Sequence, residues 1–318
     1  MLYHLLKDYP NLYYVLFIGV CFFGTFYALS GLKRLLPKDQ GREFAVNGAL
    51  SEGKPRGAGI IMITAFVLLC VLFIPLNTEL VIYLALIYLA MITGFLDDAA
   101  ETPWGELRKG VFDLVISVGI TITYYNFNGS TIFFFSSSFH IPSPIFIFLG
   151  IVLVWASINV TNCSDGIDGL CGSMSLISIA GAYMILRNLL LDWRFANILI
   201  CMCAVLLAYL WFNCKPSKLL MGDAGSRALG VVIAVAFLKT GHPFMFIVGA
   251  FMLILDGGTG LIKLSAIRYL RMKNFMKNIR TPIHDHMRKN LEWQDTEVVF
   301  RFTIAQALLT MLAVYAIS

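Results

Sequence analysis

Residues 143–188 read SPIFIFLGIVLVWASINVTNCSDGIDGLCGSMSLISIAGAYMILRN, two long apolar segments on either side of a short polar one. The apolar segments, about 143–159 and 170–188, each lie within the ~17–25 residues that a helix needs to cross a bilayer. The polar segment carries Asp165 and Asp168, and a charged group near the bilayer is costly unless it is paired, binds a metal or faces water. The pattern therefore predicts membrane-spanning helices with functional carboxylates at their ends.

The rest of the chain repeats this apolar pattern. Of its 318 residues, 58% are hydrophobic and 14% charged, whereas a typical soluble domain has about 25% charged residues. We expect a single all-α polytopic membrane domain over residues 1–318. About ten transmembrane helices are predicted, at residues 11–32, 57–77, 79–96, 108–126, 143–159, 170–188, 195–212, 226–240, 243–263 and 299–317.

Lysine and arginine fall mainly on one side of these helices. Twenty of the 24 lie in the loops that begin with 33–56 and end with 264–298; the others are Lys7, Arg187, Arg194 and Lys239. Because such residues are enriched in cytoplasmic loops, we expect those loops in the cytoplasm and both termini outside. The net charge of +5 then reflects topology and gives no argument for nucleic acid.

Two minor features complete the topology. Asn128-Gly129, ahead of a Phe-rich outer loop, favours a small β-hairpin on the outer surface, with a disordered aromatic loop as the alternative. The seven cysteines lie in predicted spans or cytoplasmic loops, so we expect free thiols without a disulfide framework or a zinc site.

Three aspartates and a lysine form the first candidate site. Asp97-Asp98 closes the third predicted span, and Asp223 stands between Gly222 and Gly225 at the start of another. Adjacent carboxylates point in different directions, so one can face a metal while the other takes a proton. Lys109 begins the fourth span, where it can neutralise carboxylates or a diphosphate. An acidic pair and a snorkelling lysine without function are the alternatives.

The densest polar segment is Asn159-Val-Thr-Asn-Cys-Ser-Asp-Gly-Ile-Asp-Gly169, which holds Asn162, Asp165, Gly166 and Asp168. Its glycines permit tight turns and close approach of a ligand. It lacks the Asp and Glu spacing of an EF-hand loop, so a calcium site is not expected. Its carboxylates and amides can orient ribose hydroxyls and base edges or add oxygen ligands to a metal; a structural turn is the alternative.

Two motifs follow in later cytoplasmic loops. In Leu220-Met-Gly-Asp-Ala-Gly-Ser226, backbone N–H groups can reach phosphate oxygens ahead of a helix N-terminus that favours anions. His284 and His286 follow Pro282 in the longest and most basic loop, and would point to the same side if that loop were extended. A solvated pair and a surface metal site both remain open for them.

Taken in order, these motifs resemble those of the polyprenyl-phosphate N-acetylhexosamine-1-phosphate transferases. The resemblance covers essentially the whole chain. Its C-terminal part, Thr281-Pro-Ile-His-Asp-His286 followed by Val298-Val-Phe-Arg-Phe302, is similar to the branch that transfers phospho-N-acetylmuramoyl-pentapeptide. Asp39-Gln40 and the stretch 53–59 fit that branch too.

The resemblance implies a reaction in which UDP-N-acetylmuramoyl-pentapeptide and undecaprenyl phosphate give lipid I and UMP, with Mg²⁺ as cofactor. It also implies a homodimer in the bacterial inner membrane, with its active site on the cytoplasmic face. Asp97 is then the base for the lipid phosphate, with Asp98 beside it, and Asp223 binds Mg²⁺, with Asp98 as a further metal ligand.

The same resemblance assigns the substrate-binding residues. It implies that Lys109 lies close to the diphosphate and that the two histidines are the outer members of a histidine triplet. The nucleotide-sugar site and this loop then comprise Lys109, Asn159, Asn162, Asp165, Gly166, Asp168, Leu220, His284 and His286.

The chain departs from the family pattern at three places. Asp285 replaces the middle histidine, Ala99-Ala100-Glu101 follows the acidic pair, and Leu220 stands where phenylalanine is usual. The nearest alternative is therefore the same chemistry with UDP-N-acetylglucosamine. An alternative of another class is a cation-coupled transporter, although its carboxylates are expected near the bilayer midplane and in paired halves of the chain.

Overall fold

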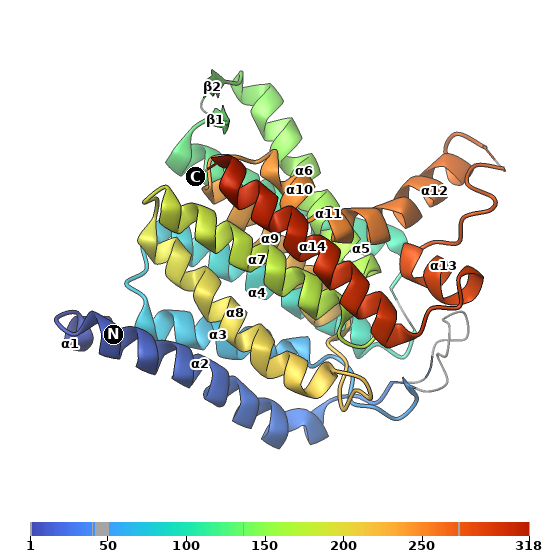
Figure 1. The fold of residues 1–318 in the computed structure, drawn as a ribbon, viewed down its shortest axis with the longest axis horizontal. Helices are drawn as coiled ribbons and strands as arrows, with labels where there is room; N and C mark the ends of the chain where they lie inside the picture. The colour runs from blue at the N-terminus through green and yellow to red at the C-terminus, as the bar shows by residue number, and fades with distance from the viewer. Residues whose placement is uncertain are drawn as a thin grey trace.

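The computed structural model describes residues 2–39, 41, 51–102, 104–135, 137–272 and 274–317; Gln40 of the Asp39-Gln40 pair lies outside these ranges. The chain is mainly helical, as predicted (Figure 1). Its first half contains α1 (Leu2–Leu6), α2 (Pro10–Leu32), η1 (Lys33–Leu35), α3 (Gly59–Phe73), α4 (Thr78–Asp98) and α5 (Glu106–Asn128). The hairpin β1 (Thr131–Phe134) and β2 (Ser137–His140) precedes α6 (Ser143–Cys163), α7 (Leu170–Asn188) and α8 (Trp193–Asn213).

The second half of the chain continues with further helices, of which the first is buried along its whole length. They are α9 (Gly222–Lys239), α10 (Met245–Gly249), α11 (Phe251–Leu253), the π-helical turn η3 (Ile254–Gly258), α12 (Thr259–Arg268), α13 (Ile283–Asn290) and α14 (Asp295–Ile317). Within the described ranges, seven helices are long and apolar enough to cross a membrane. They are α2 (extended through η1), α4, α5, α6, α7, α8 and α14, which confirms a polytopic membrane protein.

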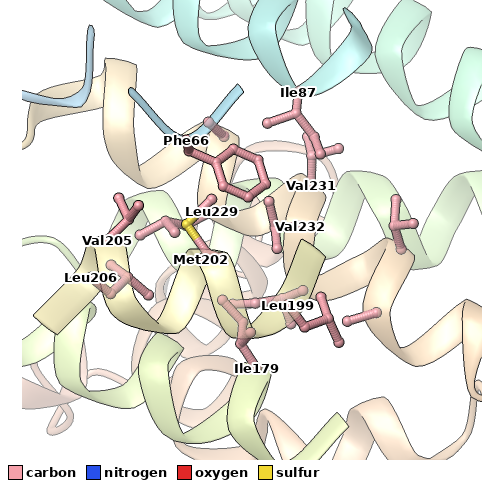
Figure 2. Packing of buried hydrophobic residues seen from close by; sticks show 14 of the residues in the cluster. Phe66, Ile87, Ile179, Leu199, Met202, Val205, Leu206, Leu229, Val231 and Val232 are labelled. Atoms are coloured by element: carbon pink, nitrogen blue, oxygen red, sulfur yellow. The ribbon is translucent and has the colours of Figure 1, made fainter. Parts of the chain in front are cut away.

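Helix α9 is the centre of the bundle. Every one of its residues is buried, and it packs against α3, α4, α6 and α7. Figure 2 shows Phe66 of α3, Met202 of α8 and Leu229 of α9 in the shared hydrophobic cluster. Because α9 is enclosed by protein, it can carry charged side chains that lipid would exclude.

The segment predicted as one span over 243–263 differs from that prediction. It is divided into α10, α11, η3 and α12, and α12 extends away from the bundle in Figure 1. The π-helical turn lies where α6 and this segment touch, since a Cβ on Gly257 would lie 2.2 Å from the carbonyl oxygen of Val160. The turn directs Asp256 into the core, where it is fully buried.

The predicted hairpin is confirmed, but its turn is not where the sequence placed it. β1 and β2 pair antiparallel, from Thr131 opposite His140 to Phe134 opposite Ser137. Asn128 instead ends α5, and Gly129, with a φ of 74°, follows it as the helix cap. A glycine suits this positive φ at a helix end as well as in a hairpin turn, so the dipeptide alone did not distinguish them.

The two ends of the bundle differ in what they carry. Figure 1 places both termini at the end with the hairpin, and α13 with its neighbouring loops at the opposite end. All seven cysteines are free thiols, as predicted; the Sγ atoms of Cys21 and Cys201 lie 3.3 Å apart in the core. The predicted acidic residues gather at the α13 end.

Candidate active site

Three helix ends meet at this end of the bundle. Asp97 and Asp98 are the last two residues of α4, Lys109 lies in the first turn of α5, and Asp223 lies in the first turn of α9. Helices α4 and α9 approach closely because a glycine faces the contact: a Cβ on Gly94 would lie 2.3 Å from the carbonyl oxygen of Asp223. Small residues allow such close backbone approach in membrane bundles.

Lys109 joins two of the aspartates. Its Nζ lies 2.5 Å from Oδ2 of Asp97 and 3.3 Å from Oδ2 of Asp223. The other oxygen of Asp97 accepts a hydrogen bond from the backbone N–H of Trp104, at 2.6 Å. The predicted proximity of Lys109 to the acidic pair is therefore confirmed, and its ammonium group lies between carboxylates from α4 and α9.

Asp98 points away from Asp97 and contacts different groups. Its Oδ1 lies 2.9 Å from Nε of Arg56, and its Oδ2 accepts a hydrogen bond from the backbone N–H of Ala224 at 3.0 Å. A carboxylate that accepts from the first turn of a helix stabilises the N-terminal end of the helix dipole. The two adjacent carboxylates thus have separate surroundings, as their positions on a helix predicted.

Arg56 is a site residue that sequence reasoning missed. Its Nη1 lies 3.0 Å from Oδ1 of Asp39, and its Nη2 lies 3.9 Å from Oδ1 of Asp223. In the sequence it counted only as one of many cytoplasmic cations. Its position in the glycine- and proline-rich stretch 53–59 could have indicated a role in the site, because that stretch is similar to the phospho-N-acetylmuramoyl-pentapeptide-transferring branch described above.

The charge on Arg56 is secure. Burial by itself would lower its pKa, but the neighbouring carboxylates of Asp98 and Asp39 raise that pKa above the ordinary arginine value. Guanidinium groups bind carboxylate and phosphate through several hydrogen bonds in a fixed planar geometry. With 21% of its side chain exposed, Arg56 can also reach a ligand from solvent.

The carboxylates have the chemistry to hold a divalent cation. In the described ranges, no three His, Cys, Asp or Glu side chains are already gathered around a common metal position. Among the described residues, four carboxylates (Asp39, Asp97, Asp98 and Asp223) nevertheless form ion pairs with two cations, Arg56 and Lys109. The excess equals the charge of one divalent ion, and oxygen donors are those that Mg²⁺ prefers. The residues therefore fit Mg²⁺.

The polar segment 159–169, which includes the end of α6 and the turn before α7, lies beside this centre. Nδ2 of Asn162 donates to Oγ of Ser226 in α9, at 2.9 Å. Asp168 accepts from the backbone N–H of Ser217 at 3.2 Å, and Nζ of Lys54 lies 3.6 Å from the same carboxylate oxygen. Asn162 and Asp168 therefore connect this segment to the loop after α8 and to the start of α9.

Other predicted members of this group are more dispersed. Asp165 is partly buried just after α6. Asn159 lies more deeply along α6, where its Nδ2 is 3.4 Å from Oδ2 of Asp113. Leu220 joins two loops through its backbone, because its N–H donates to Pro55 and its carbonyl accepts from Ala58. The structure thus brings Leu220 next to the stretch 53–59.

His284 is buried against the same region. A Cβ on Gly166 would lie 2.3 Å from Nε2 of His284, so the ring covers this glycine closely. Its Nδ1 lies 2.8 Å from Oδ2 of Asp256, whose Oδ1 also accepts the backbone N–H of His284. Asp256 is a second residue near the site that was not predicted from the sequence. A continuous span over 243–263 gave no reason to expect its side chain to point into the core.

The surroundings of His284 favour its charged form. Burial lowers the pKa of the imidazole, but Asp256, with a further contribution from Asp285, raises it above its ordinary value. Arg288 opposes this shift. His284 is thus buried and paired with Asp256, which favours the protonated form of its imidazole.

His286 does not share the position of His284. Residues 283–290 form α13 and are not extended, and side chains two residues apart on a helix face different directions. Nδ1 of His286 instead lies 3.3 Å from the backbone N–H of Arg280. The expectation that both histidines point to the same side is therefore wrong.

Comparison with known proteins agrees with this arrangement. Residues 80–241 match the model of glycosyl transferase family 4. The chain is 37% identical, over 94% of its length and 88% of the relative's, to a phospho-N-acetylmuramoyl-pentapeptide-transferase of Treponema pallidum (strain Nichols). It is 27% identical, over 83% of its length and 80% of the relative's, to the protein of that name from Francisella tularensis subsp. novicida (strain U112).

Proposed function

Because the chain belongs to glycosyl transferase family 4 and, within it, to the phospho-N-acetylmuramoyl-pentapeptide transferases, we propose the following activity. The protein transfers phospho-N-acetylmuramoyl-pentapeptide from the UDP-sugar to undecaprenyl phosphate. This reaction forms lipid I and releases UMP. The observation that carries this function is the cluster of Asp97, Asp98 and Asp223 around Lys109 and Arg56, at helix ends of a membrane bundle.

The reaction needs a nucleophilic phosphate oxygen and charge neutralisation at the diphosphate. In our proposal, Asp97 accepts the proton of the lipid phosphate or orients that group. A lipid phosphate oxygen then bonds to the sugar-linked phosphorus, while the bond from that phosphorus to the bridging oxygen breaks and UMP leaves with its electron pair. Lys109, between Asp97 and Asp223, stabilises the negative charge of the diphosphate.

Arg56 supplies a second cation to the diphosphate. In this structure it contacts Asp39 and Asp98, and it lies within 3.9 Å of Asp223. A phosphate group that enters beside it is recognised by the guanidinium N–H groups that solvent can reach. Lys109 and Arg56 therefore flank the position of the transferred phosphorus from α5 and from the stretch 53–59.

We also propose that the reaction depends on Mg²⁺ held by Asp223 with Asp98. When bound, the ion supplies Lewis-acid neutralisation of diphosphate charge. Both oxygens of Asp98 already accept contacts from Arg56 and Ala224, so Asp223 is the principal ligand in this proposal. Asp98 fixes the first turn of α9, which carries Asp223.

The nucleotide and sugar bind beside this centre. Asn162 presents a polar group from the last turn of α6 and Asp168 one from the segment that follows it, and Leu220 presents an apolar side chain from the adjoining loop. His284 closes this side over Gly166, next to Asp165, while Asn159 contributes a polar group deeper along α6, near Asp113. His286, which accepts the backbone N–H of Arg280 at 3.3 Å, is proposed to line the outer edge of the site.

The location and assembly of the enzyme are also part of this proposal. The active site faces the cytoplasm of a bacterium, because the excess of Lys and Arg lies on the loops of that end. The enzyme is a homodimer in the inner membrane, and its product feeds peptidoglycan growth and so cell shape and division. Light scattering of the purified protein, corrected for detergent, measures the oligomeric state.

The substrate assignment is tested by UMP release from purified protein with undecaprenyl phosphate and Mg²⁺. Turnover with UDP-N-acetylmuramoyl-pentapeptide and none with UDP-N-acetylglucosamine is expected. Turnover with UDP-N-acetylglucosamine alone would contradict the assignment and connect Leu220 and Asp285 to substrate choice. Absence of UMP with either sugar, from protein with a cooperative unfolding transition, would contradict the activity itself.

A further inference from the structure

A second pair of charges lies one helical turn deeper than the reacting groups. Nη2 of Arg227 in α9 contacts Oδ1 of Asp113 in α5 at 2.5 Å, and both side chains are nearly inaccessible to solvent. Arg227 follows Asp223 by four residues, and Asp113 follows Lys109 by four, so each pair lies on one helix face. The order of charges alternates between the two helices: Asp223 faces Lys109, and Arg227 faces Asp113.

The position of Lys109 relative to Asp223 depends on this deeper pair. Helix α5 packs mainly against α4 and α6 and touches α9 at few positions. The same Nη2 of Arg227 also lies 3.4 Å from the backbone carbonyl oxygen of Lys109. Arg227 therefore ties α9 to α5 at the residue whose side chain lies between the catalytic carboxylates.

Stability by itself does not favour this pair. Among the described residues, Nη1 of Arg227 is buried and has no hydrogen-bond partner. A buried donor without a partner destabilises a fold, and apolar residues of similar size often replace buried ion pairs without loss of stability. Since stability does not explain why Arg227 and Asp113 are charged, a role in the geometry of the site accounts for this ion pair.

We infer that Arg227 and Asp113 are positioning residues, which hold Lys109 at the distance from Asp97 and Asp223 that the transfer reaction needs. The inference rests on the proposed role of Lys109 in that reaction. Since a displacement of about 1 Å can cost 10²-fold in rate, removal of the pair is expected to lower kcat by about 10- to 100-fold.

The test is a double-mutant cycle with Lys109. The double variant Asp113→Leu/Arg227→Met removes both charges, and its kcat and unfolding temperature are compared with those of wild type. The same two changes are then made in Lys109→Ala. If the pair acts through Lys109, the changes lower kcat in the wild-type background and have no further effect in Lys109→Ala.

A matched control is available at the opposite end of the bundle. Lys239 of α9 and Glu79 of α4 form another buried ion pair, with Nζ to Oε1 at 3.0 Å. Glu79→Gln/Lys239→Met is expected to leave kcat unchanged. If this control lowered kcat as much as the Asp113/Arg227 changes, the effect would be general to buried charges and the inference would be overturned.

Two further outcomes are decisive. Unchanged kcat in Asp113→Leu/Arg227→Met, or losses that multiply fully in the Lys109→Ala background, would refute a positioning role. Wild-type kcat in Lys109→Ala itself would instead refute the proposed role of Lys109. If the double variant does not fold, Arg227→Lys keeps the charge but lacks the branched head group, and is expected to lower kcat with the same dependence on Lys109.

Discussion

At the residue scale, Arg56 connects two parts of the site that are distant in sequence. It contacts Asp98 at the end of α4 and Asp39 in the preceding loop. Asp98 has no exposed side-chain surface, so its charge depends on this guanidinium and on the N–H of Ala224. Arg56 therefore serves both the stability of the cluster and, in our proposal, the binding of diphosphate.

Arg56→Met is expected to lower turnover by about 10²-fold, because one of two cations at the diphosphate is lost. It should also destabilise the protein by about 3 kcal/mol, because buried carboxylates lose their partner. Arg56→Lys, which keeps the charge, should recover part of the stability and less of the turnover. UMP release and thermal unfolding measure the two effects, with the exposed Lys218→Met as a control that should change neither. Normal turnover in Arg56→Met would exclude the proposed role.

His284 predicts a pH-dependent contribution to stability. Asp256 raises the pKa of His284 above its ordinary value, despite the burial that lowers it, so the folded protein binds the proton more tightly than the unfolded chain. The stabilisation is fully present below about pH 6.5, the ordinary histidine pKa, and is lost as the pH rises through the folded-state pKa. The unfolding temperatures of wild type and His284→Asn should therefore converge as the pH rises above about 6.5.

Asp256→Asn provides the matched control for this pH dependence. In that background the effect of His284→Asn on the unfolding temperature should no longer shrink as the pH rises, because the partner that raises the pKa of His284 is gone and burial, which lowers that pKa, remains. A constant difference across the pH range in the wild-type background would show that the His284–Asp256 pair is not the origin of the stabilisation.

At the element scale, the contact between α4 and α9 sets the position of three carboxylates. A Cβ on Gly94 would lie 2.3 Å from a backbone oxygen of α9, a distance that side-chain movement cannot relieve. Gly94→Ala is expected to separate the helices, destabilise the protein by about 1–3 kcal/mol and lower turnover at least about 10-fold. UMP release and unfolding temperature are the measurements.

Gly24→Ala in α2 is the control for Gly94→Ala. A Cβ on Gly24 would meet no atom within 4 Å, so this change should leave turnover intact and stabilise the helix by up to about 1 kcal/mol. Equal effects of the two substitutions would mean that the response reflects glycine in a helix and not the approach of α4 to α9.

Elements differ in how far the sequence predicts them. Long apolar helices such as α6 and α7 follow directly from their hydropathy, and Asp97 and Asp98 separate as adjacent helix residues must. The π-helical turn of residues 254–258 cannot be predicted from hydropathy, because it depends on the close packing of Gly257 against Val160. The same is true of α13, whose helical turns separate His284 from His286.

At the scale of the whole molecule, charge and hydropathy predict which ends of helices meet, but not their contacts. The Lys and Arg bias correctly grouped the acidic motifs at one end of the bundle. Successive loops alternate between the two ends, so the order of spans and loops is enough for this prediction. The bias could not distinguish Arg56 or Arg227 from other cations of that end, since their ion pairs arise from helix packing across long sequence separations.

The orientation of the molecule in the membrane gives another prediction. Cys214 is the one exposed cysteine, and it lies in the loop after α8 at the active-site end. If this end faces the cytoplasm, a membrane-impermeant thiol reagent should label the protein in inverted vesicles and not in intact cells. Cys214→Ser should abolish this labelling, and labelling of Cys214 in intact cells would reverse the proposed orientation.

The central claim is that the carboxylates around Lys109 transfer the phospho-sugar to the lipid carrier. Its most direct test follows lipid-linked product and UMP from UDP-N-acetylmuramoyl-pentapeptide and undecaprenyl phosphate, for wild type and Asp97→Asn at equal folded concentration. We predict equal amounts of the two products from wild type and a loss of about 10²-fold or more in Asp97→Asn. Near-normal turnover in Asp97→Asn would contradict the catalytic role of this cluster.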